Sequence, residues 1–205
     1  FRLAPGGAQE YFGIQADLVT YGKTLGGGYP VGVVCGKHKW MKRWKENRPA
    51  DICFARGTFN AHPVVMSAMK AFLDEIEKPE IQALYEGLDE RWNQRCEKFN
   101  HTMREFDFPI QATNMSSVWT ISYTQPGRYH WLLQFYLRAE GLALSWVGTG
   151  RLIFSLNYGE TEFQAVLDRF VAAAKKMSED GWWWQNPQLT HRNIRLQILR
   201  ETLGW

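Results

Sequence analysis

A lysine surrounded by glycines is the residue best suited to covalent chemistry. Lys23 follows the β-prone run 16–21 and Gly22, and it precedes the triplet 26–28. An amine at the end of a buried strand, beside glycines that let another molecule approach the backbone, can be partly desolvated and deprotonated, as a Schiff-base nucleophile must be. The spacing alone favours a solvated lysine before a flexible glycine turn. The residue order excludes a P-loop, because there the lysine follows the glycines.

A second candidate site is the hydroxyl of Thr58. Gly57-Thr58 comes shortly before a helix predicted to begin at Pro63. Backbone N–H groups and a hydroxyl can converge on an anion at such a place. His62 could cap this helix or lie near the anion, and the capping role is favoured. The sequence therefore indicates a possible anion site at Thr58.

Other polar and aromatic residues carry weaker signals. Arg151, beside Gly150, could face a substrate carboxylate, but a surface arginine at the start of a strand is favoured and we assign it no role. The basic, aromatic stretch 37–45 has the composition of a nucleic-acid or carrier-protein patch, although a solvated amphipathic helix is favoured. We interpret the tryptophans at 182–184 as packing against a partner or against a missing part of a longer protein. The histidines lack metal-ligand spacing, so no metal site is predicted.

Composition excludes several classes of protein. The 205 residues carry a net charge of +3, too small an excess to indicate a polyanionic partner, so no nucleic acid is expected. No apolar run is long enough for a bilayer-spanning helix, so no membrane is expected either. The cysteines (Cys35, Cys53 and Cys96) are odd in number and widely spaced, which argues against a disulfide framework and favours the cytoplasm. Aromatic residues reach 15% and include ten Trp, which suggests extensive packed or partner-covered surface.

The elements that must hold these residues follow from hydrophobic periodicity. Short apolar runs at 16–21 and 31–36 predict strands, and apolar residues at helical spacing predict helices. In the first part of the chain the predicted helices are 37–48, 63–77 and 80–106. In the second part, strands are predicted at 110–123, 142–146 and 152–158, helices at 130–139 and 161–177, and a basic helical pattern within 182–205.

Several short motifs together resemble the class III aminotransferases of the pyridoxal-phosphate-dependent transferase fold type I. They are Phe1-Arg2, Pro5-Gly6-Gly7-Ala8-Gln9, Phe12-Gly13-Ile14, Ala16-Asp17, Tyr21-Gly22-Lys23, Gly26-Gly27-Gly28, Pro30-Val31-Gly32, Gly57-Thr58-Phe59 and His62-Pro63. The resemblance is closest to the glutamate-1-semialdehyde aminomutase-like branch, which includes aminotransferase domains of polyketide and nonribosomal peptide synthases. It implies an α/β fold, with residues 1–78 as the end of the large domain and 79–205 as the small C-terminal α/β domain with a basic tail.

The resemblance also implies a site and a reaction. Lys23 would form the Schiff base with pyridoxal 5'-phosphate, and Thr58 would bind the phosphate of the cofactor held by the other subunit of a homodimer. An amino donor and a carbonyl substrate would then react in two half-reactions, with Lys23 as both anchor and proton shuttle. A carrier-bound β-ketoacyl chain is one candidate acceptor. Intramolecular aminomutation is the alternative.

One departure from the family pattern concerns the acidic partner of the cofactor. In the family, an aspartate that pairs with the pyridine nitrogen lies in a D-E-x-x-T-G-F-R stretch, and this chain starts at its final Phe-Arg. We therefore expect a C-terminal portion that is inactive by itself, because that nitrogen must be protonated for the cofactor to act as an electron sink. A noncatalytic partner-binding fragment remains an alternative of another class, and a nucleic-acid binder is a weaker one.

Overall fold

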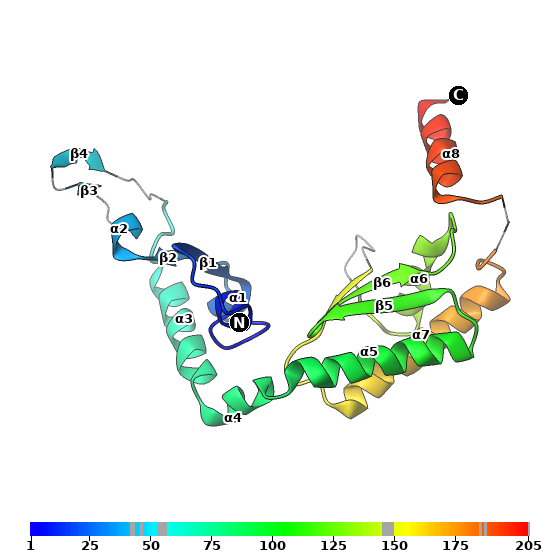
Figure 1. Cartoon of the computed structure of the whole chain (residues 1–205), viewed down its shortest axis with the longest axis horizontal. Coiled ribbons are helices and arrows are strands. Elements are labelled where there is room, and N and C mark those ends of the chain that lie inside the picture. Colours follow the sequence, from blue (N-terminus) through cyan, green and yellow to red (C-terminus); the bar gives the residue numbers. More distant parts are fainter. Residues whose placement is uncertain are drawn as a thin grey trace. The chain divides into compact units, whose positions relative to one another are not determined.

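The computed structural model describes residues 1–41, 44–45, 47–52, 57–144, 150–184, 186 and 188–204. The chain divides into two compact units, Phe1–Glu86 and Gly87–Trp205, which we call unit 1 and unit 2 (Figure 1). The domain boundary predicted near Lys78 lies inside unit 1 and stays a prediction.

Unit 1 is built on an antiparallel strand pair. The strand β1 (Leu18–Gly22) pairs with β2 (Gly32–Gly36) in unbroken register, close to the strands predicted at 16–21 and 31–36. Between them the chain forms a short 3-10 helix, η1 (Lys23–Gly26), which packs against the long helix α3 (Pro63–Ile76). Leu25 of η1 is only 3% exposed. The helix predicted at 63–77 is therefore present, and it supports the turn after β1.

The remaining elements of unit 1 are short. They are α1 (Ala8–Tyr11), α2 (His38–Met41), β3 (Trp44–Lys45), β4 (Arg48–Ile52), α4 (Pro79–Gln82) and η2 (Ala83–Tyr85). The single helix predicted over 37–48 is wrong, because β3 and β4 form an antiparallel hairpin after α2 ends. A proline at 49 disfavours helical backbone at the residue before it, and this restriction outweighs the helical spacing of Trp40 and Trp44.

Unit 2 is a three-stranded antiparallel sheet with helices packed on it. The strand order is β5 (Ile110–Met115), β6 (Val118–Tyr123) and β7 (Arg151–Ile153). Figure 1 shows α5 (Leu88–Glu105) and α7 (Glu160–Glu179) running along one side of this sheet. The other elements are η3 (His130–Leu132), α6 (Leu133–Ala139) and α8 (His191–Leu203).

Four sequence predictions that bear on unit 2 change in the structure. The strand predicted at 152–158 is limited to β7, because the chain leaves the sheet after Ile153 and turns at 156–157. The long helix predicted over 80–106 is interrupted at Gly87, whose φ of 61° is the left-handed conformation that glycine adopts readily. The strand predicted over 110–123 is a hairpin of β5 and β6. Residues 142–144 of the strand predicted at 142–146 are irregular, and 145–146 lie outside the described residues.

The core of unit 2 is aromatic. Trp119 of β6 lies with its ring centroid 5.9 Å from Trp92, 5.7 Å from Phe99 and 5.3 Å from Phe154. Trp92, Trp119 and Phe99 are each 1% exposed, so much of the aromatic content fills this interior.

A buried arginine closes one end of this core. The Arg95 guanidinium lies 4.6 Å from the ring centroid of Trp92, pairs with Glu160 at 2.7 Å and donates to the carbonyl oxygen of Tyr158. These contacts fix the start of α7 on α5. Among the described helices, none is long and apolar enough to cross a membrane.

Candidate active site

Lys23 occupies an unusual backbone position. It is the first residue of η1, directly after β1, and its φ of 54° lies in the left-handed region that few residues other than glycine adopt. Such a conformation costs free energy and persists only where the surrounding structure holds it. The backbone is therefore strained at the residue that the sequence analysis selected for its chemistry.

The Lys23 amine is accessible. β1 is half-buried and the lysine side chain is exposed, so the burial expected at the strand end is not present within unit 1. In the described ranges, Nζ of Lys23 has no hydrogen-bond or ion-pair partner. The side chain of Lys23 is therefore accessible to a carbonyl compound that approaches unit 1.

Backbone hydrogen bonds tighten the turn that follows Lys23. The N–H of Gly27 donates to the carbonyl oxygen of Thr24 at 2.9 Å, and that of Tyr29 donates to Gly26 at 3.0 Å. Gly27 has a φ of 57°, and a Cβ placed there would lie 3.7 Å from Cβ of Ala68 on α3. The turn is thus fixed by its own bonds and seated on α3.

Aromatic packing supports the strand that leads to Lys23. The ring of Tyr21 stacks on Phe1 with centroids 5.2 Å apart, and Phe1 meets Phe72 of α3 edge to face at 5.0 Å. The Tyr85 hydroxyl donates to the Phe1 carbonyl oxygen at 2.6 Å, and burial raises the pKa of Tyr85, so it remains a donor at neutral pH. These contacts couple β1 to α3 and to η2.

Thr58 lies in the turn before α3, with its side chain exposed. It lines a groove of about 910 Å³ in unit 1, together with Tyr29, Val31, His62 and Met66 among others. The groove is mostly apolar, and the N-terminus of α3 opens at it, where backbone N–H groups favour an anion. Lys23 does not line this groove, so the structure does not bring the two predicted site residues into one pocket.

The sequence analysis did not predict that the two walls of this groove lie together. Residues 29–33 follow the glycine triplet, whereas 57–69 enter and form the first turns of α3. The apolar run directly after Pro30 was the available signal, but only the tertiary fold shows that it faces Thr58.

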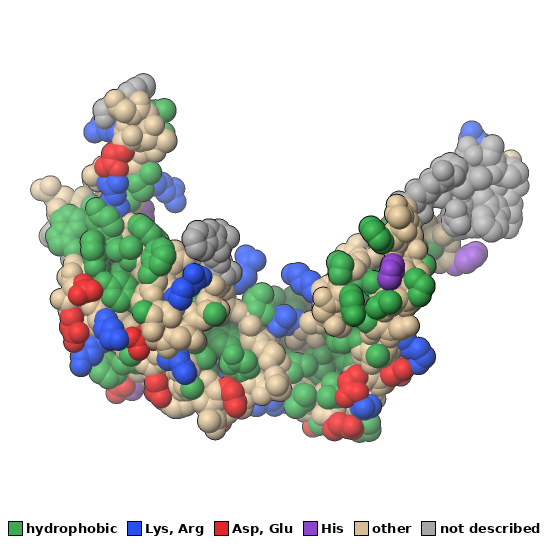
Figure 2. Space-filling model, turned by 180° about the vertical axis from the view of Figure 1, so that it is seen from behind, with side chains coloured by type: hydrophobic (Ala, Val, Ile, Leu, Met, Phe, Trp, Pro, Cys, Tyr) green, Lys and Arg blue, Asp and Glu red, His purple; other side chains and the backbone are tan. Residues whose placement is uncertain are grey.

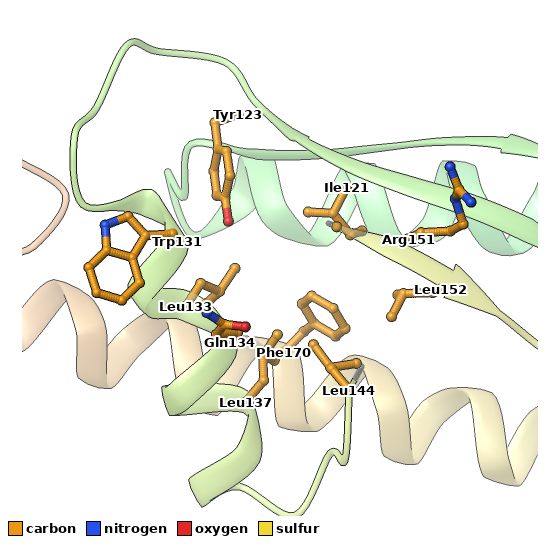
Figure 3. A pocket seen from close by; sticks show the side chains of 11 residues that line it. Ile121, Tyr123, Trp131, Leu133, Gln134, Leu137, Leu144, Arg151, Leu152 and Phe170 are labelled. Atoms are coloured by element: carbon orange, nitrogen blue, oxygen red, sulfur yellow. The ribbon is translucent and has the colours of Figure 1, made fainter. Parts of the chain in front are cut away.

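Arg151 belongs to unit 2. It lies on β7, is exposed, and lines a small cavity with Tyr123, Gln134 and Leu137 among others. Figure 3 shows its guanidinium directed away from the leucines at the centre of that cavity. Gly148 and Thr149, the neighbours considered with it, lie outside the described residues. Arg151 keeps no assigned role.

The aromatic residues near α8 are partly exposed. Figure 2 shows hydrophobic side chains gathered on unit 2 beside this helix. Trp182 contacts Tyr129 with centroids 5.3 Å apart, and Trp131 is 53% exposed. Trp183 is half-buried and donates from Nε1 to the carbonyl oxygen of Ala174 at 3.0 Å. The tryptophan run thus packs in part against its own unit.

Comparisons with known proteins identify a family. A sequence model described as "Aminotransferase class-III" matches residues 6–173. A glutamate-1-semialdehyde 2,1-aminomutase of Ruminiclostridium cellulolyticum is 38% identical over 119 residues, which is 58% of this chain and 26% of that protein. The chain therefore spans about a quarter of the length of this curated relative.

Solved structures agree with the sequence match. An omega-transaminase from Sphaerobacter thermophilus superposes with a TM-score of 0.70 at 26% identity, covering 85% of this chain and 42% of that one. A beta-phenylalanine aminotransferase from Variovorax paradoxus gives a TM-score of 0.66 at 28% identity, covering 88% and 42%. The α/β fold class predicted from the sequence is confirmed by these similarities.

Proposed function

Since the chain belongs to the class III aminotransferases, we propose that it forms the lysine-bearing part of an enzyme that moves amino groups with pyridoxal 5'-phosphate. The observation that carries this proposal is Lys23, an exposed amine without a partner in the described ranges, on a strained turn directly after β1. A noncatalytic binding fragment would not require an accessible amine at this position.

The residues present fit the cofactor's two reactive groups. The primary amine of Lys23 is suited to its aldehyde, and the Thr58 hydroxyl, in the turn that leads into α3, is suited to its phosphate. When bound, pyridoxal phosphate supplies an electron sink for the substrate carbon that carries nitrogen. The lysine and threonine line different parts of unit 1, which accords with Thr58 serving the cofactor of a second subunit in a homodimer.

The role of Lys23 in the reaction has two parts. Its Nζ would hold the cofactor through the cofactor's aldehyde carbon until an amino donor takes that place. The amine at Nζ, then free, would accept the proton that leaves the substrate carbon as a general base and return a proton as a general acid. A lysine on a fixed turn suits both parts, because proton transfer needs its nitrogen within hydrogen-bond distance of the reacting atom.

For the substrates we propose an amino donor and a separate carbonyl acceptor, with a carrier-bound β-ketoacyl chain as one candidate acceptor. Similarity to solved transaminases favours transfer between two molecules. The alternative is intramolecular aminomutation, which similarity to glutamate-1-semialdehyde 2,1-aminomutases favours. The two differ in a simple measurement, because an aminomutase converts one substrate without a second amine or carbonyl compound.

The test uses the complete gene product that contains residues 1–205. It is incubated with pyridoxal phosphate, reduced with borohydride and digested, and the pyridoxyl label is mapped by mass spectrometry. We expect the label on Lys23, and its loss in Lys23→Ala. Lys175, which is exposed on α7, provides a control variant, Lys175→Ala, that should keep the label. A label on another lysine in the wild-type protein, or none, would refute the assignment.

A further inference from the structure

One residue, Val31, fills the space beside both ends of the turn that carries Lys23. At the beginning of the turn, a Cβ placed on Gly22 would lie 3.1 Å from the carbonyl oxygen of Val31. At its end, a Cβ placed on Gly26 would lie 2.8 Å from Cγ1 of Val31 and 3.3 Å from its Cβ. Val31 directly precedes β2 and is half-buried, so the strand pair holds it in place.

Gly26 is a glycine for lack of space and not for its backbone conformation. Its φ lies outside the left-handed region, whereas Gly27 and Gly28 have φ of 57° and 97°. An alanine at 26 would therefore suit the backbone, but its methyl group would overlap with the side chain of Val31. Gly26 itself is buried, so that overlap cannot be relieved by moving into solvent.

We propose that Val31 is a positioning residue for Lys23: its carbonyl and side chain fix the turn in the conformation that holds the lysine at positive φ. The proposal rests on the proposed function of Lys23 as the cofactor lysine. With its neighbours fixed, the strained backbone of Lys23 cannot relax toward ordinary helical values. A displacement of about 1 Å at a reacting group can cost about 100-fold in rate, so this contact would set reactivity.

The first test is Gly26→Ala in the complete gene product. The new methyl group should displace the turn and lower the rate at which pyridoxal phosphate labels Lys23 by about tenfold or more. The absorbance band of the bound cofactor should move or change its pH dependence. A second measurement needs no cofactor: the rate of competitive acylation of Lys23 relative to Lys175. This ratio should change by at least about twofold, because displacement of the turn changes the surroundings of the Lys23 amine.

The second test is rescue by Val31→Ala. In the double variant the Cγ1 contact is gone, and the remaining 3.3 Å separation requires only a small shift. We expect the double variant to regain most of the labelling rate and the wild-type acylation ratio. The matched control is Val34→Ala in the Gly26→Ala background, because Val34 of β2 is 56% exposed and does not line the groove. It should leave the labelling rate of Gly26→Ala unchanged.

The outcomes separate this inference from the proposed function. If Gly26→Ala folds and labels like the wild type, or if the double variant is no better than Gly26→Ala, Val31 does not position Lys23. Circular dichroism of each variant identifies loss of folding. If Gly26→Ala unfolds but the double variant folds, the result still supports the contact between positions 26 and 31. If the wild-type protein takes no label at Lys23, the proposed function fails, whereas the acylation ratios still decide the role of Val31.

Discussion

His130 is enclosed by its neighbours in unit 2. Its side chain is 6% exposed, and its ring centroid lies 4.3 Å from that of Tyr123 and 5.5 Å from that of Trp183. A Cβ placed on Gly127 would lie 2.0 Å from Nε2 of the histidine, which has no hydrogen-bond partner in the described part of the chain. If that nitrogen were protonated, its N–H would find no hydrogen-bond acceptor among the described residues.

Burial therefore lowers the pKa of His130 from 6.5 to about 4, with a further contribution from the charge of His191. Burial also raises the pKa of Tyr123 to about 12, so its hydroxyl stays protonated and keeps donating to the His130 carbonyl oxygen at 2.9 Å. Since the unfolded chain binds the histidine proton more tightly, this group stabilises the fold fully above pH 6.5 and loses that contribution as the pH falls toward 4.

The resulting prediction is a pH-dependent free energy of unfolding. His130 should account for a loss of about 3 kcal/mol between neutral pH and about pH 4. Urea titrations followed by tryptophan fluorescence at several pH values measure it. In His130→Gln, whose side chain does not titrate, the loss in free energy of unfolding over the same pH range should be smaller by that amount. Parallel slopes for the two proteins would show that His130 is not the responsible group.

At the scale of elements, the turn between β5 and β6 is formed by serines instead of the Gly, Asn or Asp residues that usually occupy hairpin turns. Ser116 adopts a φ of 50°, is 2% exposed, and has a hydroxyl with no partner in the described ranges. The side chain of Asn114 donates to the Ser116 carbonyl oxygen at 3.2 Å and supports the turn. A left-handed serine with a buried, unpaired hydroxyl carries two costs at once.

Ser116→Gly should therefore stabilise the protein. Glycine accepts positive φ and removes the unpaired hydroxyl, so the free energy of unfolding should rise by up to about 1 kcal/mol. The same substitution at Ser122, which pairs with Gln111 of β5 near the end of β6, should lower it by about 0.5 to 1 kcal/mol. Urea midpoints measure both, and a destabilised Ser116→Gly would mean that the serine is needed for packing.

The hairpin also shows where sequence reasoning succeeds and fails. Helices with a sustained apolar period, 63–76 and 160–179, were predicted within a few residues of their bounds. The turn was missed because the two turn residues, Ser116 and Ser117, are neither Gly, Asn nor Pro, so 110–123 was predicted as one strand. Lys23 and Thr58 were predicted from local motifs. The groove at Thr58 was not, because its walls are distant in sequence.

At the scale of the whole molecule, unit 1 carries an exposed apolar surface around Thr58. Phe59 is 79% exposed, and Val64 and Met66 of α3 are each 48% exposed. Exposed apolar side chains that line one groove are typical of surfaces that another chain covers. They accord with the homodimer proposed above, in which Thr58 meets the cofactor of the second subunit.

Met66→Lys should weaken that association. A lysine buried against an apolar partner loses hydration without compensation, so the dimer dissociation constant should increase by about tenfold or more. Sedimentation velocity of the complete gene product measures it. Phe106→Lys is the matched control, because Phe106 of unit 2 is 52% exposed and does not line the groove. Equal sedimentation of both variants and the wild type would exclude this surface from the interface.

The aromatic core of unit 2 has an optical consequence. Trp92 and Trp119 hold their rings 84° apart at a centroid distance of 5.9 Å, each fully enclosed. Indoles in fixed, asymmetric contact give strong near-ultraviolet circular dichroism, which disappears when tertiary packing is lost even if helices persist. The near-ultraviolet circular dichroism of this pair should therefore report on loosening of the unit 2 core without an added label.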